Sequence, residues 1–313
     1  MTAFLNPERT KAAPGPGPTP EALLKALDVS IGRRIHGLVP GDFRAHGRGF
    51  GTELAAVRPY QPGDDVRHID WNATARTTVP HVRERVPERA IDTWLLLDVS
   101  PSMSFGTAER RKTDVAEGVA LAVAHIATRH ANRLAVVTFG GTTVSRTAPR
   151  GGRLGLLLAL RAARMEPEMD AEPRTPGVDA SAARALRLIA GSRSRRGLVV
   201  VLSDFRGPRD WLRPLAAAAQ RHDVLAVEIR DPREDELVDV GQLTLIDSES
   251  GREVRVDTSS TKLRRRFGEA AAAERASLAA DLRGTRARHI VLSTSNDWLR
   301  SLAGQLRVSG AVS

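Results

Sequence analysis

The sequence contains no cysteine. This absence excludes disulfide bonds, thiol catalysis and metal sites built on cysteine ligands. Aromatic residues make up only 4% of the chain, so alanine, leucine and valine must supply most of the core. No apolar run approaches the length of a membrane-spanning helix, and the first twenty residues lack the apolar core of a signal peptide. These absences predict a soluble, cytoplasmic protein.

Lysine is also scarce, since only four of the 47 basic residues are lysines. The formal net charge is +10, and a basic chain of this kind attracts nucleic acid, anionic lipid or acidic protein surfaces. The arginines are nevertheless spread out and are not interleaved with aromatic residues, as a base-stacking surface requires. The composition therefore favours a solvated basic surface. A nucleic-acid-binding or membrane-surface protein, acting through Arg193–Arg196 and Arg264–Arg266, remains the alternative.

Composition changes along the chain predict three parts. Residues 1–36 include a Pro/Gly tract and read as a flexible lead-in with a short helix. Residues 37–90 carry recurring glycines and short strand-like runs, which predict a small β-rich module. Residues 91–313 alternate apolar strand-like runs with amphipathic helical segments. This alternation predicts an α/β domain with a doubly wound, mostly parallel sheet.

A polar loop follows the first strand of the predicted sheet. The apolar run Trp94–Leu97 ends at Asp98, and Ser100 and Ser102 follow within a segment broken by Pro101. The carboxyl ends of strands are where open α/β sheets place their ligands. One carboxylate with two hydroxyls supplies hard oxygen donors that suit a magnesium-like ion. The alternative is a polar strand-to-loop junction with an N-capping serine.

A second strand ends in the same way, because Leu198–Leu202 is followed by Ser203 and Asp204. In a doubly wound sheet of order 3-2-1-4-5-6, the first and fourth strands are neighbours. Asp98 and Asp204 are therefore expected to meet at one edge of the sheet. Two carboxylates held close together repel each other unless a cation or a proton intervenes. This second aspartate strengthens the prediction of a metal site.

The motif Asp98-Val99-Ser100-Pro101-Ser102 resembles the Asp-x-Ser-x-Ser signature of the von Willebrand factor A fold. That fold carries a metal-ion-dependent adhesion site, in which a threonine and a further aspartate come from two other loops. The resemblance implies that Asp204 is the aspartate and that Thr175 is the threonine. It also implies a bound Mg²⁺ or Mn²⁺, with Asp98, Ser100 and Ser102 as anchors and with Thr175 and Asp204 binding directly or through water.

The segment 58–76, RPYQPGDDVRHIDWNATAR, is similar to the bacterial family catalogued as domain of unknown function 58. The similarity extends over roughly residues 37–302. It implies a von Willebrand factor A-like domain behind a β-rich module. It also implies a chaperone-like adaptor that works with a MoxR-type AAA+ ATPase in the assembly or maturation of a client protein.

Acidic and basic residues alternate within 58–76, and two interpretations of them stay open. They predict either a surface that docks a partner or a hydrogen-bonded network of ion pairs that clamps the module, as partly buried junctions use. The candidate docking residues are Asp64, Asp65, Arg67, His68, Asp70 and Trp71.

Motifs for catalysis are absent from the sequence. There is no phosphate-binding loop of the Gly-x-x-x-x-Gly-Lys-Ser/Thr type. Ser203 lacks the flanking glycines of a nucleophile elbow. Ser100 stands where a haloacid-dehalogenase-type phosphatase needs a second carboxylate. The sequence thus predicts a protein-interaction module without catalytic residues, and a metal-dependent hydrolase is a further alternative.

Overall fold

A computed structural model describes residues 3–5, 15–17, 53–86, 91–106, 110–128, 132–165, 181–191, 196–247 and 253–308. The chain divides into two compact units. One unit comprises Val39–Ala90, and the other comprises Met1–Leu38 together with Ile91–Ser313.

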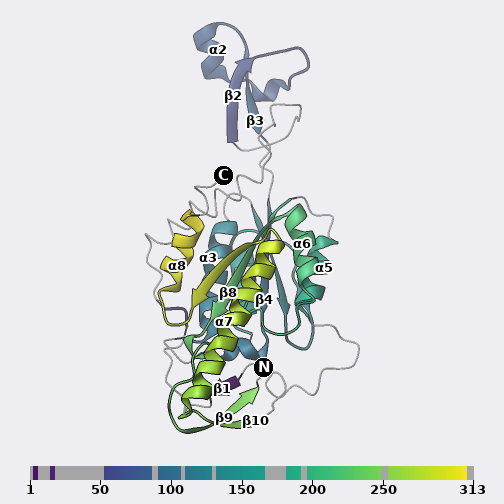
Figure 1. The fold of residues 1–313 in the computed structure, drawn as a ribbon. Coiled ribbons are helices and arrows are strands. Elements are labelled where there is room, and N and C mark those ends of the chain that lie inside the picture. The colour runs from purple at the N-terminus through teal and green to yellow at the C-terminus, as the bar shows by residue number, and fades with distance from the viewer. Residues whose placement is uncertain are drawn as a thin grey trace. The chain divides into compact units, whose positions relative to one another are not determined.

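The larger unit is built on a six-stranded sheet of order β11-β8-β7-β4-β5-β6 (Figure 1). All neighbouring strands are parallel except the edge strand β6. The interior strands are apolar along their length because helices cover both faces of the sheet. This arrangement confirms the predicted doubly wound α/β fold. The strands are β4 (Asp92–Asp98), β5 (Arg133–Phe139), β6 (Ser145–Arg146), β7 (Leu198–Ser203), β8 (Asp223–Arg230) and β11 (Arg288–Ser293).

Two hydrophobic clusters, one on each face, hold the helices to the sheet. The first cluster receives side chains from α3 (Lys112–Ala127), α4 (Gly152–Ala163) and α8 (Trp298–Val308). The second receives them from α5 (Ala182–Ala190), α6 (Leu212–Arg221) and α7 (Thr261–Gly284). Alternate residues of β4 enter opposite clusters, with Leu95 in the first and Leu96 in the second. The core is thus a three-layer sandwich centred on β4 and β7.

A second, three-stranded sheet has the order β1-β9-β10. The hairpin of β9 (Gln242–Asp247) and β10 (Glu253–Asp257) is antiparallel. The strand β1 (Ala3–Leu5) extends the hairpin by pairing with β9, although the sequence assigns these residues to a flexible lead-in. The reason is that the exposed edge of β9 offers backbone groups to a strand from elsewhere in the chain.

Residues 15–17, also within the predicted lead-in, contact α3 and α8. The Gly15 amide donates to Asp114 Oδ1 at 3.1 Å, and the Trp298 indole donates to the Pro16 carbonyl at 2.8 Å. Gly118, in α3, lies under this contact, because a Cβ there would overlap both the Trp298 ring and the Pro16 side chain. These three residues are therefore held in place by the two helices.

The smaller unit is an antiparallel pair, β2 (Glu53–Pro59) and β3 (His81–Val86), joined by a long connection. That connection contains the short 3-10 helix η1 (Val66–His68) and the helix α2 (Trp71–Thr77). Asp65 caps η1, and Asp70 caps α2 by accepting from the Asn72 and Ala73 amides at 3.0 Å each. The β-rich character predicted for this part of the chain is therefore present as an antiparallel pair of strands.

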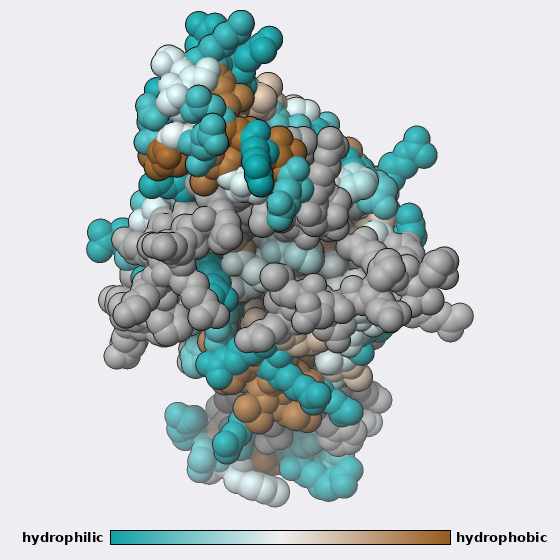
Figure 2. Space-filling view, turned by 90° about the horizontal axis from the view of Figure 1, so that it is seen from below, coloured by the Kyte–Doolittle hydropathy of each residue, from teal (hydrophilic) through white to brown (hydrophobic). Residues whose placement is uncertain are grey.

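Within the described part of the chain, no helix is long and apolar enough to cross a membrane. In the space-filling view, most of the coloured surface is hydrophilic, and the hydrophobic residues gather in separate patches (Figure 2).

Candidate functional site

The loop after β4 brings three of the predicted ligands together. Asp98 is the last residue of β4, and the 3-10 helix η2 (Pro101–Ser104) begins three residues later. The Ser100 amide donates to Asp98 Oδ1 at 2.9 Å, which folds the loop back over the strand end. The Ser100 and Ser102 hydroxyl oxygens lie 3.0 Å apart, and both residues are buried.

The end of β7 lies beside this loop, as the predicted strand order requires. Leu97 of β4 is in register with Leu202 of β7, so Asp98 and Ser203 follow at the same level. The Ser203 hydroxyl donates to Asp98 Oδ2 at 2.5 Å and accepts from the Phe205 amide at 2.8 Å. Phe205 has a φ of 53°, a left-handed conformation that costs a non-glycine residue about 1 kcal/mol or more. Such strained residues gather at functional sites.

The pKa values of Asp98 and Asp204 are shifted in opposite directions. Burial, together with the nearby negative charge of Asp204, raises the pKa of Asp98 to about 6. Burial also acts to raise the pKa of Asp204, but the neighbouring Lys112 ammonium outweighs it and holds that pKa below its usual value. Asp204 is thus compensated by a basic side chain, whereas the partners of Asp98 among the described residues are hydroxyls and a backbone amide.

Lys112 also belongs to this site, although the sequence patterns do not predict it. Its side chain is 0% exposed, and its ammonium donates to Asp204 Oδ2 at 2.6 Å and to Glu234 Oε1 at 2.7 Å. Burial acts to lower the pKa of Lys112, but the charges of the two carboxylates offset it and raise that pKa above its usual value. The available signal was that the chain has only four lysines and that this one begins a helix just after the motif loop.

A backbone hydrogen bond places Lys112 beside the site. The Lys112 amide donates to the Phe105 carbonyl at 2.8 Å, which closes the loop onto the start of α3. Gly106 permits this closure, since a Cβ there would overlap the backbone of Arg110 and Arg111.

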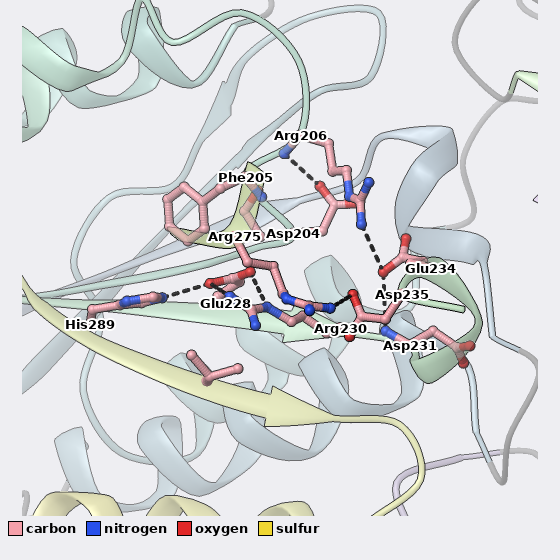
Figure 3. Close-up of polar contacts among 12 residues, drawn as sticks. Asp204, Phe205, Arg206, Glu228, Arg230, Asp231, Glu234, Asp235, Arg275 and His289 are labelled. Carbon is pink, nitrogen blue, oxygen red and sulfur yellow. Dashed lines mark hydrogen bonds and ion pairs between the residues drawn. The ribbon is translucent and has the colours of Figure 1, made fainter. Parts of the chain in front are cut away.

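Glu234 extends the site toward the end of β8. It is the last residue of the 3-10 helix η3 (Pro232–Glu234), and its Oε2 accepts from the Asp231 amide at 3.1 Å. Figure 3 shows Arg206 between Asp204 and Glu234: its amide donates to Asp204 Oδ1 at 3.1 Å, and its guanidinium lies 3.5 Å from Glu234 Oε2. Both acidic partners of Lys112 are therefore also held by Arg206.

The backbone of Gly140, just after β5, lies against Asp98 and forms a wall of the site beside the loop after β4. It has a φ of 86°, and a Cβ at this position would lie 2.6 Å from Asp98 Oδ1 and 2.9 Å from the Ser100 nitrogen. Only glycine can therefore bring this backbone against the carboxylate.

The oxygen atoms of this site fit a divalent cation of the magnesium type. Adjacent ligands of an octahedral Mg²⁺ at 2.0–2.1 Å lie roughly 3 Å apart, which is the spacing of the two serine hydroxyls. The Ser100 and Ser102 side chains also interact with Asp98 and Asp204 respectively, so all four donors face one another. Thr175, the expected fifth ligand, lies outside the described residues. The described residues, this site included, contain no group of three or more His, Asp or Glu side chains arranged to hold a metal, so the serine hydroxyls must supply part of the ligand set.

The charged residues of the 58–76 segment are engaged within their own unit. Asp64 accepts two hydrogen bonds of 2.8 Å from Arg58, Asp65 pairs with Arg67 at 2.7 Å, and Asp70 pairs with Arg83 at 2.9 Å. His68 also has an interaction partner. Trp71 differs from them, because 71% of its surface is exposed. An exposed tryptophan is the kind of residue that anchors protein interfaces.

Comparison of the sequence with known proteins places the chain in a family. The model of the family described as "Protein of unknown function DUF58" matches residues 56–277. An uncharacterized protein of Mycobacterium tuberculosis is 41% identical over 283 residues, which cover 90% of this chain and 87% of that protein. A protein of Mycobacterium avium is 44% identical over 133 residues, or 42% of this chain and 77% of its own length.

Two solved structures are similar at low sequence identity. The conserved hypothetical protein BatB from Bacteroides thetaiotaomicron is 11% identical, with a TM-score of 0.44 over 71% of this chain and 100% of that chain. The SpRpn10 VWA domain is 12% identical, with a TM-score of 0.36 over 69% of this chain and 95% of that chain. The sheet has the doubly wound α/β strand order that the resemblance to the von Willebrand factor A fold implies. On the family model and the Mycobacterium tuberculosis relative, the chain belongs to the DUF58 family.

Proposed function

We propose that this protein is a non-catalytic adaptor that binds a partner through a divalent metal ion. The ion is Mg²⁺ or Mn²⁺, held by Asp98, Ser100, Ser102 and Asp204, with Thr175 as the expected threonine ligand. A carboxylate of the partner fills the open coordination position.

The observation that supports this proposal most is the state of Asp98. It is a carboxylate at the carboxyl edge of the sheet, it has no basic partner among the described residues, and it faces a second carboxylate. A divalent cation bound there removes the repulsion between the two aspartates. The ion has a coordination position for a partner because Mg²⁺ prefers six ligands and commonly keeps several waters, which an incoming carboxylate can displace.

The polar residues around Asp98 hold the loops of the site together. The Ser203 hydroxyl donates to Asp98 and accepts from the Phe205 amide, so it joins the end of β7 to the end of β4. The Lys112 ammonium is engaged by two carboxylates and is fully buried. These structural roles fit the proposed non-catalytic adaptor.

The partner we propose is a MoxR-type AAA+ ATPase, with which the protein serves the assembly or maturation of a client. This proposal rests on the family. Trp71 is proposed as an additional contact because it is exposed, and the charged residues Asp64, Asp65, Arg67, His68 and Asp70 surround it in sequence.

Capture of the ATPase on the immobilised protein tests the partnership. We expect retention in Mg²⁺ and loss in chelator. An ATPase also needs Mg²⁺ with its nucleotide, so the decisive comparison is Asp98→Ala against wild type, without nucleotide and with Mg²⁺ present. Equal capture by the two proteins contradicts a metal-mediated contact, and Trp71→Ala reports separately on the second proposed contact.

A further inference from the structure

We propose that the Lys112 ammonium is a fixed positive charge beside the candidate metal site and that, together with Glu234, it sets the affinity of the site for a divalent ion. The inference rests on the proposed function in one respect, namely that the ion binds at Asp98 and Asp204. It concerns two residues that are not among the metal ligands.

The first step is the burial of the lysine. The side chains of Lys112, Asp204 and Glu234 are 0%, 2% and 3% exposed, and they come from α3, the end of β7 and η3. Transfer of an ammonium from water into such a place is strongly unfavourable unless carboxylates compensate it. The two short contacts of 2.6 and 2.7 Å provide that compensation. If Lys112 moved to solvent, two buried carboxylates would lose their ammonium partner, so the lysine stays in this position.

The second step is the balance of charge. Lys112 and Arg206 face Asp204 and Glu234, so two basic side chains match two acidic ones. Of the three carboxylates Asp98, Asp204 and Glu234, Asp98 is the one without a basic partner among the residues that the structure describes. A divalent ion that binds beside Asp98 consequently keeps about one unit of positive charge, which an anionic group of a partner can neutralise.

The third step is competition for one oxygen. Asp204 Oδ2 accepts from the Lys112 ammonium and Oδ1 accepts from the Arg206 amide, so both oxygens of this carboxylate already have donors. An ion that approaches Asp204 must share it with the ammonium. The lysine therefore weakens metal binding. Glu234 limits this effect because the ammonium also donates to it, and its negative charge offsets part of the ammonium's positive charge.

Two near-isosteric substitutions should then act in opposite directions. Lys112→Met removes the positive charge beside the ion, and we expect Mn²⁺ to bind at least about tenfold more tightly. Glu234→Gln leaves the ammonium to Asp204 alone, and we expect Mn²⁺ to bind about tenfold more weakly. Damage to the fold would weaken binding in both variants, so the opposite signs distinguish an electrostatic role from a structural one.

Calorimetric titration with Mn²⁺ at pH 8 provides the measurement, with thermal unfolding as the check that each variant is folded. Tighter binding by Lys112→Met and weaker binding by Glu234→Gln support the inference. Equal or weaker binding by a folded Lys112→Met variant overturns it and leaves the proposed function standing. If Lys112→Met does not fold, an unchanged or tighter affinity in Glu234→Gln overturns it.

Wild-type protein separates the two claims. If wild type binds no Mn²⁺ while Lys112→Met does, the proposed metal-dependent function fails and the role of Lys112 holds, with the ammonium as the occupant of the site. If neither protein binds, both claims are wrong.

Discussion

At the scale of single residues, the site contains one carboxylate with a basic partner and one whose ionisation is unfavourable. Asp204 interacts with Lys112, whereas burial and the charge of Asp204 raise the pKa of Asp98 to about 6. Ionised Asp98 is therefore unfavourable in the folded protein and favourable in the unfolded chain. A bound cation would remove this difference.

The raised pKa of Asp98 predicts how stability depends on pH. The folded-state value of about 6 lies above the ordinary 3.8, so between these values the unfolded chain releases the Asp98 proton first. In metal-depleted buffer, the contribution of Asp98 to the free energy of unfolding should fall as pH rises from 4 to 6, by on the order of 2 kcal/mol. It should be constant above about pH 7.

Denaturant unfolding of wild type and Asp98→Asn across this range provides the measurement. The variant lacks the titrating group, so the difference between the two proteins should carry the slope. Saturating Mg²⁺ should abolish it. A difference that is flat with pH, or that changes in the opposite direction, contradicts the assignment.

Gly140→Ala tests the wall of the site. The left-handed backbone costs about 1 kcal/mol for alanine, and the new methyl must also push against Asp98 and Ser100. Gly207→Ala is the matched control, because Gly207 also has a positive φ, of 91°, but has open space around its Cβ position. We expect loss of metal binding only in Gly140→Ala. Equal binding by the two variants would show that Gly140 does not shape the site.

The sequence predicts Asp98, Ser100, Ser102 and Asp204 because each follows a recognisable apolar strand, and strand order then brings them together. It does not predict Lys112, since a lysine at the first turn of an amphipathic helix is ordinarily solvated. Its burial depends on Asp204 and Glu234, which lie far away in the sequence and are brought to it only by the fold.

At the scale of elements, α3 shows how packing overrides local propensity. Gly118 stands in the interior of this helix, where glycine costs about 1 kcal/mol relative to alanine. It is nevertheless needed, because Trp298 of α8 and Pro16 occupy the space that a side chain would fill. The contact joins three segments from the start, the middle and the end of the chain.

Gly118→Ala should therefore lower the free energy of unfolding, by about 1–3 kcal/mol, through overpacking against Trp298. Gly304→Ala in α8 is the control, because Gly304 is also helical but has open space at its Cβ position. That substitution should be neutral or stabilising by up to about 1 kcal/mol. If both variants are stabilised, the Trp298 contact is unimportant.

The same contrast decides which elements can be predicted. The interior strands of the central sheet are visible in the sequence as apolar runs. The pairing of β1 with β9 and the contact of Pro16 with Trp298 are not visible, since both depend on surfaces created by distant parts of the chain.

At the scale of the whole molecule, the excess of arginine is partly neutralised within the fold. Arg264 pairs with Asp239 at 2.8 Å, Arg265 pairs with Glu269 at 3.5 Å, and Arg209 interacts with both Glu274 and Asp281. One of the two basic stretches considered for nucleic-acid binding thus has acidic partners for two of its three arginines. The other includes residues outside the described part of the chain.

The central claim, that a divalent ion binds where Asp98 and Asp204 meet, is tested most directly by calorimetric titration of the whole protein with Mg²⁺ and Mn²⁺. Asp98→Ala removes the uncompensated carboxylate. Asp92→Ala is the matched control, because Asp92 lies at the other end of the same strand and pairs with Arg133. We expect one ion to bind wild type and Asp92→Ala, and no ion to bind Asp98→Ala. Absence of binding to wild type, or equal binding by all three proteins, would contradict the account.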